Sequence, residues 1–165
     1  MSQSVNSYNI GVYSWLLDIL QTIFRMIPWS TEPGLYALGN PDPNSPVIVT
    51  CNYDLTVRRV IRALADCDVW LVVAPSSGIN VWCAAAGGHF GTHQVVTALK
   101  TCGIEARVRH RRVILRQLSA TGVIAQEVSR GCGWKVHFGP VYAIVCDAIS
   151  LWIGGCAPCV ALARR

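Results

Sequence analysis

The sequence predicts an α/β domain of Rossmann-like, three-layer architecture, with a mostly parallel sheet, a cap helix and an N-terminal amphipathic helix. Two observations predict this class. From residue 46 onward, short apolar runs alternate with segments of helical periodicity, and the connections between them are short; such repeats form a parallel sheet with helices on both faces. In addition, 165 residues suffice for one domain with a proper core and hardly for two.

The N-terminal region, residues 1–32, is expected to hold an amphipathic helix and a linker. Within 10–27 the polar residues recur on one helical face, opposite a broad apolar face. These polar residues are Ser14, Asp18, Gln21, Thr22 and Arg25. The pattern fits equally a helix packed on its own domain and a helix that docks to a membrane surface or a partner. Prolines and glycines between residues 28 and 46 predict a turn-rich connector.

A strand–helix–strand unit opens the main domain, which is expected to span residues 33–152. Residues 46–51 have the pattern of a buried strand, 54–66 of a helix and 68–74 of a second strand. Three such elements in about thirty residues form a βαβ unit, which makes the two strands parallel.

The alternation of helices and strands continues to the end of the main domain. A helix is expected to begin at Thr92, as its N-cap, and to stop at Gly103. The remaining expected elements are one or two strands in 104–115, a helix in 121–133, a strand in 134–140 and a helix in 145–153. A tail, 153–165, contains the pair Cys156 and Cys159, which fits a plain tail, a redox-active pair or half of a metal site.

Composition and charge exclude several classes of protein. With 52% apolar and 14% charged residues, the chain is not disordered. The net charge of +5 includes a basic run at 107–116, which lacks interleaved aromatic residues and so favours a solvated strand or loop over a nucleic-acid site. An anionic cofactor tail or an acidic partner protein would suit this run equally well. The eight scattered cysteines, without a signal peptide, indicate a reducing cytoplasm, and glycines and a proline interrupt the apolar stretch 141–163, which argues against a membrane span.

The loop 75–92 is the place where chemistry is expected, because open α/β sheets bind ligands beyond the carboxyl ends of their strands. Asn80 is a good N-cap, so Cys83 falls at the third position of a short cap helix, where backbone N–H groups favour a thiolate. Residues 84–88 are all alanine or glycine. A flat, wide ligand could lie against that surface, and a tightly packed cap helix with a buried cysteine would explain it equally well.

Four segments carry a resemblance to a known family. They are residues 33–52, the loop 78–92 with its Asn-Val-Trp-Cys-Ala-Ala core, residues 108–123 and residues 138–143. Together they resemble the corrinoid-binding domain of mercury-methylation corrinoid proteins, which is similar to the corrinoid iron–sulfur protein of the acetyl-CoA pathway. The resemblance covers roughly residues 33–150, in order and without large gaps.

The resemblance implies a methyl carrier, of methyltransferase type, that binds a corrinoid (cobalamin) with its nucleotide base off the cobalt. Cys83 would be the lower axial ligand, and a methyl group would pass from a folate-type donor to an acceptor, Hg(II) in the mercury case. The cofactor-binding residues expected besides Cys83 are Thr50, Asn52, Gly78, Asn80, Val81, Trp82, Ala84, Ala85, Ala86, Phe90, Gly91 and Thr92.

The resemblance also implies partners. A ferredoxin-like iron–sulfur protein and a methyl-folate methyltransferase are the expected partners, and nucleic acid is not. The cysteine pattern gives the cytoplasm as the expected location, and contact with the inner face of the membrane, through residues 10–27 or a missing C-terminal region, stays open.

The chain departs from the family pattern at four positions. Gly87 stands in place of a lysine, His89 in place of a threonine, Cys51 in place of an alanine and Arg116 in place of a proline. The missing lysine, together with the lack of the membrane helices that follow this domain in proteins of the mercury type, motivates a rival hypothesis. In it, a paralogue or truncated domain has kept the fold, lost methyl transfer and acts as a binding or interaction module.

Overall fold

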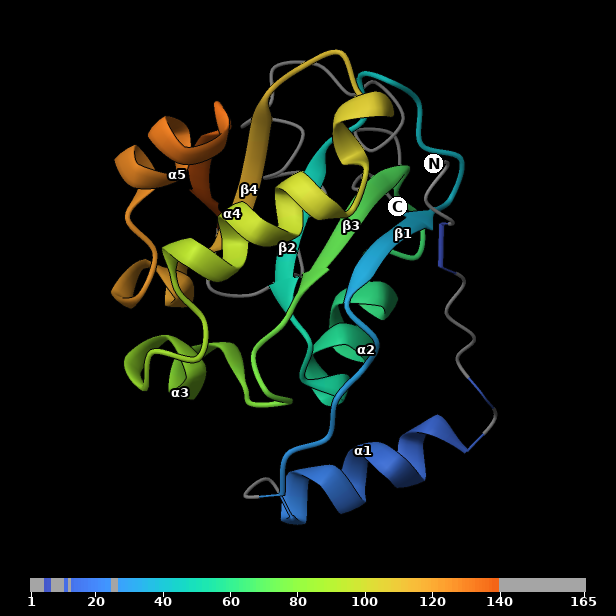
Figure 1. Ribbon diagram of the computed structural model, residues 1–165. Coiled ribbons are helices and arrows are strands. Elements are labelled where there is room, and N and C mark those ends of the chain that lie inside the picture. Colours follow the sequence, from blue (N-terminus) through green and yellow to red (C-terminus); the bar gives the residue numbers. More distant parts are fainter. Residues whose placement is uncertain (1–4, 7–10, 12, 25–26, 140–165) are drawn as a thin grey trace.

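The computed structural model describes residues 5–6, 11, 13–24 and 27–139. At its centre is a five-stranded sheet with the strand order β1-β3-β2-β4-β5 (Figure 1). The strands are β1 (Gly34–Leu38), β2 (Val47–Cys51), β3 (Val69–Ala74), β4 (Arg112–Arg116) and β5 (Lys135–Gly139). β2 to β5 run parallel to one another and β1 runs antiparallel to β3. The prediction of a mostly parallel sheet is therefore confirmed.

Helices cover both faces of this sheet. They are α1 (Ser14–Ile23), α2 (Asp54–Ala63), α3 (Val81–Ala86), α4 (Thr92–Thr101) and α5 (Ala125–Cys132), with short 3₁₀ turns η1 (Ile104–Ala106) and η2 (Gln117–Thr121). α3, α4 and α5 share one core with one face of the sheet, and α2 shares a second core with the opposite face (Figure 1). The three-layer, Rossmann-like arrangement is confirmed.

The two central strands are apolar on both sides because both of their faces are covered. Along β2, Val49 points into the core under α4 and Ile48 into the core under α2. Every residue of β2 and of β3 is buried. Continuous Val and Ile runs are typical of such doubly covered parallel strands, which is why the alternation was readable in the sequence.

Two local predictions were wrong. The segment expected to be a turn-rich connector contains β1, a short antiparallel edge strand. The N-cap of α4 is Gly91, whose N–H donates to the Gln94 side chain at 3.0 Å, and the Thr92 hydroxyl instead accepts from the Ile124 N–H at 2.9 Å. The helix in 145–153 and the pair Cys156 and Cys159 lie outside the described residues, and the division of the chain near residues 32 and 152 stays a prediction.

The glycine stop signals were confirmed. Gly103 and Gly133 follow α4 and α5 with φ of 74° and 75°, a left-handed conformation that glycine adopts without strain. Within the described part of the chain, no helix combines the length and the apolar character needed to cross a membrane.

Candidate functional site

The cap helix α3 follows β3, at the carboxyl end of the parallel strands. Asn80 is its N-cap, and the Asn80 side chain accepts a hydrogen bond from the Trp82 N–H at 3.3 Å. Cys83 is the third residue of the helix, as predicted, and its side chain is exposed. The local sequence is sufficient to explain this geometry, because an N-cap asparagine and a C-terminal glycine pair set both ends of the helix.

Asn52, directly after β2, holds the loop that leads into α3. Its side-chain oxygen accepts hydrogen bonds from the Ser76 N–H at 2.9 Å, the Ser76 hydroxyl at 2.8 Å and the Gly78 N–H at 3.0 Å. Its amide group donates to the Thr31 carbonyl at 3.3 Å. The side chain is buried, at 6% exposure. Asn52 therefore fixes the loop from below, and Gly78 makes the turn with φ of 67°.

The two sides of α3 face different surroundings. Trp82, Cys83 and Ala86 are exposed, whereas Ala84 and Ala85 are buried. A methyl group added to Gly122 would lie 2.9 Å from the Ala85 carbonyl oxygen, so the chain after η2 approaches α3 very closely. The small residues predicted to form a flat ligand surface thus divide into two groups: Ala84 and Ala85 allow close packing, and Ala86 with Gly87 forms the low surface beside the thiol.

A cavity of about 530 Å³ opens beside Cys83. Three parts of the chain line it: the loop and cap helix, the start of α2, and the N-terminal segment. The lining residues are Gly78, Ile79, Asn80, Cys83, Tyr53, Leu55, Arg59, Thr22, Ile27 and Pro28. Most of this lining is apolar, and Arg59 brings a positive charge to it.

The structure places only part of the predicted binding set in this cavity. Gly78, Asn80 and Cys83 line it. Among the other predicted residues, Thr50, Val81 and Phe90 are almost fully buried in the protein interior. Gly91 and Thr92 are partly exposed, and the Thr92 hydroxyl is engaged by the Ile124 N–H. A cofactor-binding role for these residues stays a prediction.

Sequence reasoning missed most of the cavity wall. Tyr53, Leu55 and Arg59 follow β2 directly, and the rule that ligands lie beyond carboxyl ends of strands could have pointed to them. Nothing in the sequence indicated Thr22, Ile27 or Pro28, because they reach the cavity only through the packing of the N-terminal segment.

Four described cysteines are free thiols, and they differ in accessibility. Cys51 and Cys102 are buried, Cys132 is half-buried and Cys83 is exposed. Burial raises the pKa of the Cys51, Cys102 and Cys132 thiols above the ordinary value, which keeps them protonated at neutral pH. No group of three or more His, Cys, Asp or Glu side chains in the described ranges could hold a metal ion.

Alkylation should distinguish these thiols. In the folded protein, iodoacetamide should modify Cys83 on the order of tenfold or more faster than Cys51 or Cys102, because a buried thiol reacts only after local opening. Peptide mapping by mass spectrometry at successive times measures the order. Equal rates at Cys83 and Cys51 in folded protein would contradict the placement of α3, and unfolded protein serves as the control.

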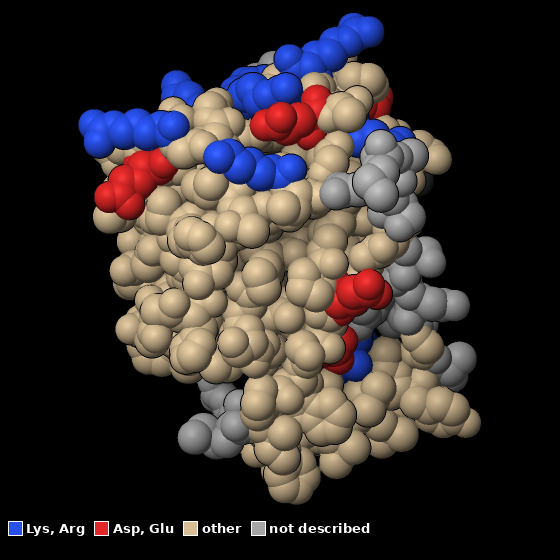
Figure 2. Space-filling model, viewed as in Figure 1, with Lys and Arg blue, Asp and Glu red and all other residues tan. Residues whose placement is uncertain are grey.

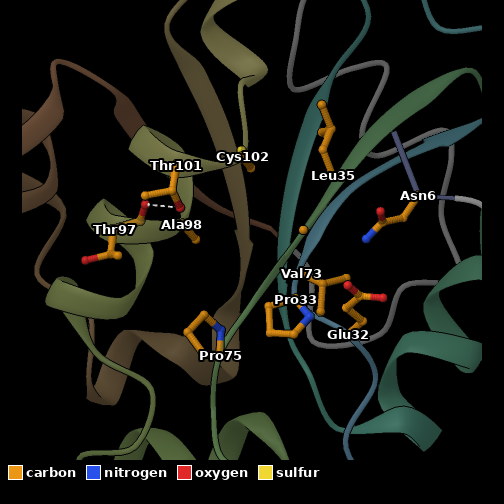
Figure 3. Close-up of a pocket in the computed structure, with 11 residues that line it drawn as sticks. Asn6, Glu32, Pro33, Leu35, Val73, Pro75, Thr97, Ala98, Thr101 and Cys102 are labelled. Atoms are coloured by element: carbon orange, nitrogen blue, oxygen red, sulfur yellow. Dashed lines mark hydrogen bonds between the residues drawn. The ribbon is translucent and has the colours of Figure 1, made fainter. Parts of the chain in front are cut away.

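A second cavity, of about 470 Å³, lies between the edge strand β1 and helix α4. Figure 3 shows Glu32, Pro33 and Asn6 on one side of it and Thr97, Thr101 and Cys102 of the α4 region on the other. The Thr101 hydroxyl donates to the Thr97 carbonyl at 2.8 Å, and burial raises the pKa of Cys102. The thiol of this cavity is buried, whereas the Cys83 thiol beside the first cavity is exposed, so the cavity beside Cys83 is the better candidate site.

Comparison with known proteins identifies the family of the chain. Residues 14–146 match the model of a family described as CO dehydrogenase/acetyl-CoA synthase delta subunit (CdhD). The acetyl-CoA decarbonylase/synthase complex subunit gamma of Methanopyrus kandleri is 39% identical over 114 residues, which are 68% of this chain and 24% of that protein.

Two further relatives bear the same name. The gamma subunit of Methanocaldococcus jannaschii is 40% identical over 137 residues, covering 78% of this chain and 28% of that protein. The gamma subunit of Archaeoglobus fulgidus is 36% identical over 118 residues, covering 69% and 24%. The chain thus spans about a quarter of the length of the curated relatives it matches. Since the family match extends from α1 through the whole sheet, the chain belongs to the CO dehydrogenase/acetyl-CoA synthase delta subunit family.

Proposed function

We propose that this domain is a corrinoid-binding methyl carrier whose cofactor sits over the cavity at α3, base-off, with the Cys83 sulfur as lower axial ligand of its cobalt. The observation that carries the proposal is the exposed Cys83 thiol on the wall of a cavity beyond the carboxyl ends of β2 and β3. Its relatives are subunits of acetyl-CoA decarbonylase/synthase complexes, and the segments around Cys83 resemble corrinoid-binding domains.

The residues present fit such a group. Beside the thiol, Ala86 and Gly87 leave a low surface on the outer side of α3, where a wide, flat macrocycle can approach the sulfur. Ile27, Leu55 and Ile79 give the cavity an apolar wall that suits a ring system. The neighbouring Trp82 is 57% exposed, which leaves further apolar area for a ligand to cover.

Each part of the site then has a defined task. When bound, the corrinoid supplies a cobalt centre that carries a methyl group. The Cys83 thiolate would hold the cobalt and donate electron density to it, which would favour release of the methyl group. Asn80 fixes the first turn of α3, and Asn52 fixes the preceding loop, so the sulfur is held at one position. The role of the protein would be to hold the cofactor and to tune the reactivity of its cobalt, and the cofactor itself would supply the methyl-transfer chemistry.

The donor, acceptor and partners form the finer part of the proposal. A folate-type donor, reached through a methyl-folate methyltransferase, and a ferredoxin-like reductant fit a methyl carrier that works in the cytoplasm. Hg(II) is the acceptor that the resemblance to mercury-methylation proteins favours. Gly87 and His89 replace a lysine and a threonine of that pattern on the exposed side of the loop. The methyl acceptor is therefore the part of the function in which this chain is most expected to differ from the mercury-methylation proteins.

Reconstitution with a cobalamin tests the proposal. The reduced and reoxidised protein should retain cobalamin and show the absorption spectrum of a base-off, thiolate-ligated cobalt. Cys83→Ala should abolish that spectrum, because the replacement removes the lower ligand. Cys132→Ala, at a half-buried thiol on α5, should leave it unchanged.

Two outcomes would overturn it. An identical spectrum in Cys83→Ala would show that the thiol is not a cobalt ligand. Failure of the wild-type protein to retain any corrinoid under reducing conditions would favour the rival function, a binding or interaction module that has kept only the fold.

A further inference from the structure

Helix α1 is attached to the domain by its polar side. Asp18 forms ion pairs with Arg58, at 3.1 Å, and with Arg62 of α2. Gln21, which is 1% exposed, accepts from Arg58 at 2.8 Å and donates to Asp54 at 3.0 Å. The buried residue of this helix is therefore a polar one. These directional contacts fix the rotation of α1 about its own axis.

The fixed rotation turns the apolar side of α1 outward. We call this side the outer apolar face; its members are Trp15, Leu16, Leu17, Ile19, Leu20 and Ile23. Each is between 40% and 68% exposed, and Tyr13 and Phe24 beside them are 72% and 52% exposed. On the face drawn in Figure 2, the lower end, where Figure 1 places α1, shows uncharged residues, and Lys and Arg gather at the opposite end. An exposed apolar patch of this kind marks an interaction surface.

The charges bordering the outer apolar face are unequally exposed. The carboxylates Asp18 and Asp54 are only 18% and 20% exposed, because they are drawn against Arg58. Of the guanidinium groups beside them, Arg62 is paired with Asp18, and Arg59 is exposed. The cationic rim of the face is therefore formed by Arg59, and the two carboxylates are recessed.

We propose that the outer apolar face of α1 docks the domain on an anionic lipid bilayer surface. The apolar residues would enter the boundary between headgroups and acyl chains, and Arg59 would contact the negative headgroups. Tyr13 and Trp15 at one end of the face and Phe24 at the other are residue types that prefer this boundary.

Charge complementarity favours lipid over a second copy of the chain. A two-fold symmetric contact places a surface against itself, so two outer apolar faces would bring two cationic rims together. An anionic bilayer instead neutralises the rim. The proposal is independent of the corrinoid, but α1 and the cavity are adjacent, since Thr22 belongs to both; docking would therefore bring the cavity beside Cys83 close to the lipid surface.

Flotation of the purified full chain with lipid vesicles tests the proposal, with and without cobalamin. We expect binding to vesicles of phosphatidylcholine and phosphatidylglycerol. It should weaken on phosphatidylcholine alone, by about fivefold for each exposed guanidinium. Ile19→Gln with Ile23→Gln should lower partitioning by about tenfold or more, because both side chains lie on the outer apolar face. Ile124→Gln is the matched control, since Ile124 is 52% exposed on a different element, and it should bind like wild type.

Three results would overturn the proposal. The first is equal binding of the Ile19/Ile23 and Ile124 variants, or no binding of the wild type. The second is binding that disappears in Arg107→Gln with Arg109→Gln, two exposed residues outside α1, which would assign attraction to the basic end instead. The third is a wild-type protein that does not bind vesicles but forms a dimer, measured by light scattering, which the Ile19 and Ile23 substitutions convert to a monomer. This result would assign the face to a second copy of the chain. Cobalamin retention by wild-type protein, measured in parallel, keeps failure here distinct from failure of the proposed function.

Discussion

Asn52→Ala should lower the free energy of unfolding by about 2–4 kcal/mol, the largest effect expected for one side chain of the site region. The replacement leaves the N–H groups of Ser76 and Gly78 without their acceptor, whereas the Ser76 hydroxyl keeps the Ile79 carbonyl as an acceptor at 2.9 Å. Ser76 is 1% exposed, so water cannot replace the amide oxygen without opening the loop. Each buried donor left unsatisfied costs about 1–3 kcal/mol.

Urea unfolding followed by circular dichroism measures this loss, and thermal unfolding should show a Tm lower by about 5–15 °C. Asn44→Ala is the matched control. Asn44 is exposed, so the loss of its side chain should change the free energy of unfolding by about 0.5 kcal/mol or less. If both variants unfolded alike, the loop would not depend on that oxygen.

Arg58→Met should cost about 3 kcal/mol and release α1 from the domain. Arg58 is 4% exposed and binds Asp18 and Asp54, each at 3.1 Å, and Gln21 at 2.8 Å. Removing one partner of a buried ionic network is strongly destabilising, because the remaining charges keep their desolvation cost without compensation. Since Asp18 and Asp54 retain some access to water, the loss should fall at the lower end of the usual range.

Unfolding curves and limited proteolysis between α1 and β1 measure this effect. Arg59→Met is the control: Arg59 is adjacent in α2 but exposed, with one long contact of 3.5 Å to Thr22, so its removal should change stability by about 0.5 kcal/mol or less. Comparable losses in both variants would mean that the buried network does not hold α1.

The fold was predictable because its signals are local. Each parallel strand is a short apolar run, and Gly103 and Gly133 end their helices as glycines in left-handed conformation. β1 escaped prediction because its five residues sit among prolines and glycines, and an edge strand of that length is specified by pairing with β3 rather than by its own pattern.

The part of the site that lies within one continuous segment of the chain was predictable from the sequence. Asn80 and Cys83 are three positions apart on one helix, so their relation follows from sequence. The role of Asn52 depends on Ser76 and Gly78, twenty-four and twenty-six positions away, and becomes visible only when β2 and β3 pair. Likewise, periodicity identified the two faces of α1, but which face turns inward depends on Arg58 and Arg62 of another helix.

The Asn52 anchor also ties the site to the order of folding. Its donors and acceptor lie on the two loops that extend adjacent parallel strands, so the anchor can close only after β2 and β3 have aligned in register. Closing that pair requires the intervening helix to form first or at the same time, which makes it a non-local and comparatively slow event. We therefore expect the exposed thiol to reach its final position only once β2 and β3 have paired.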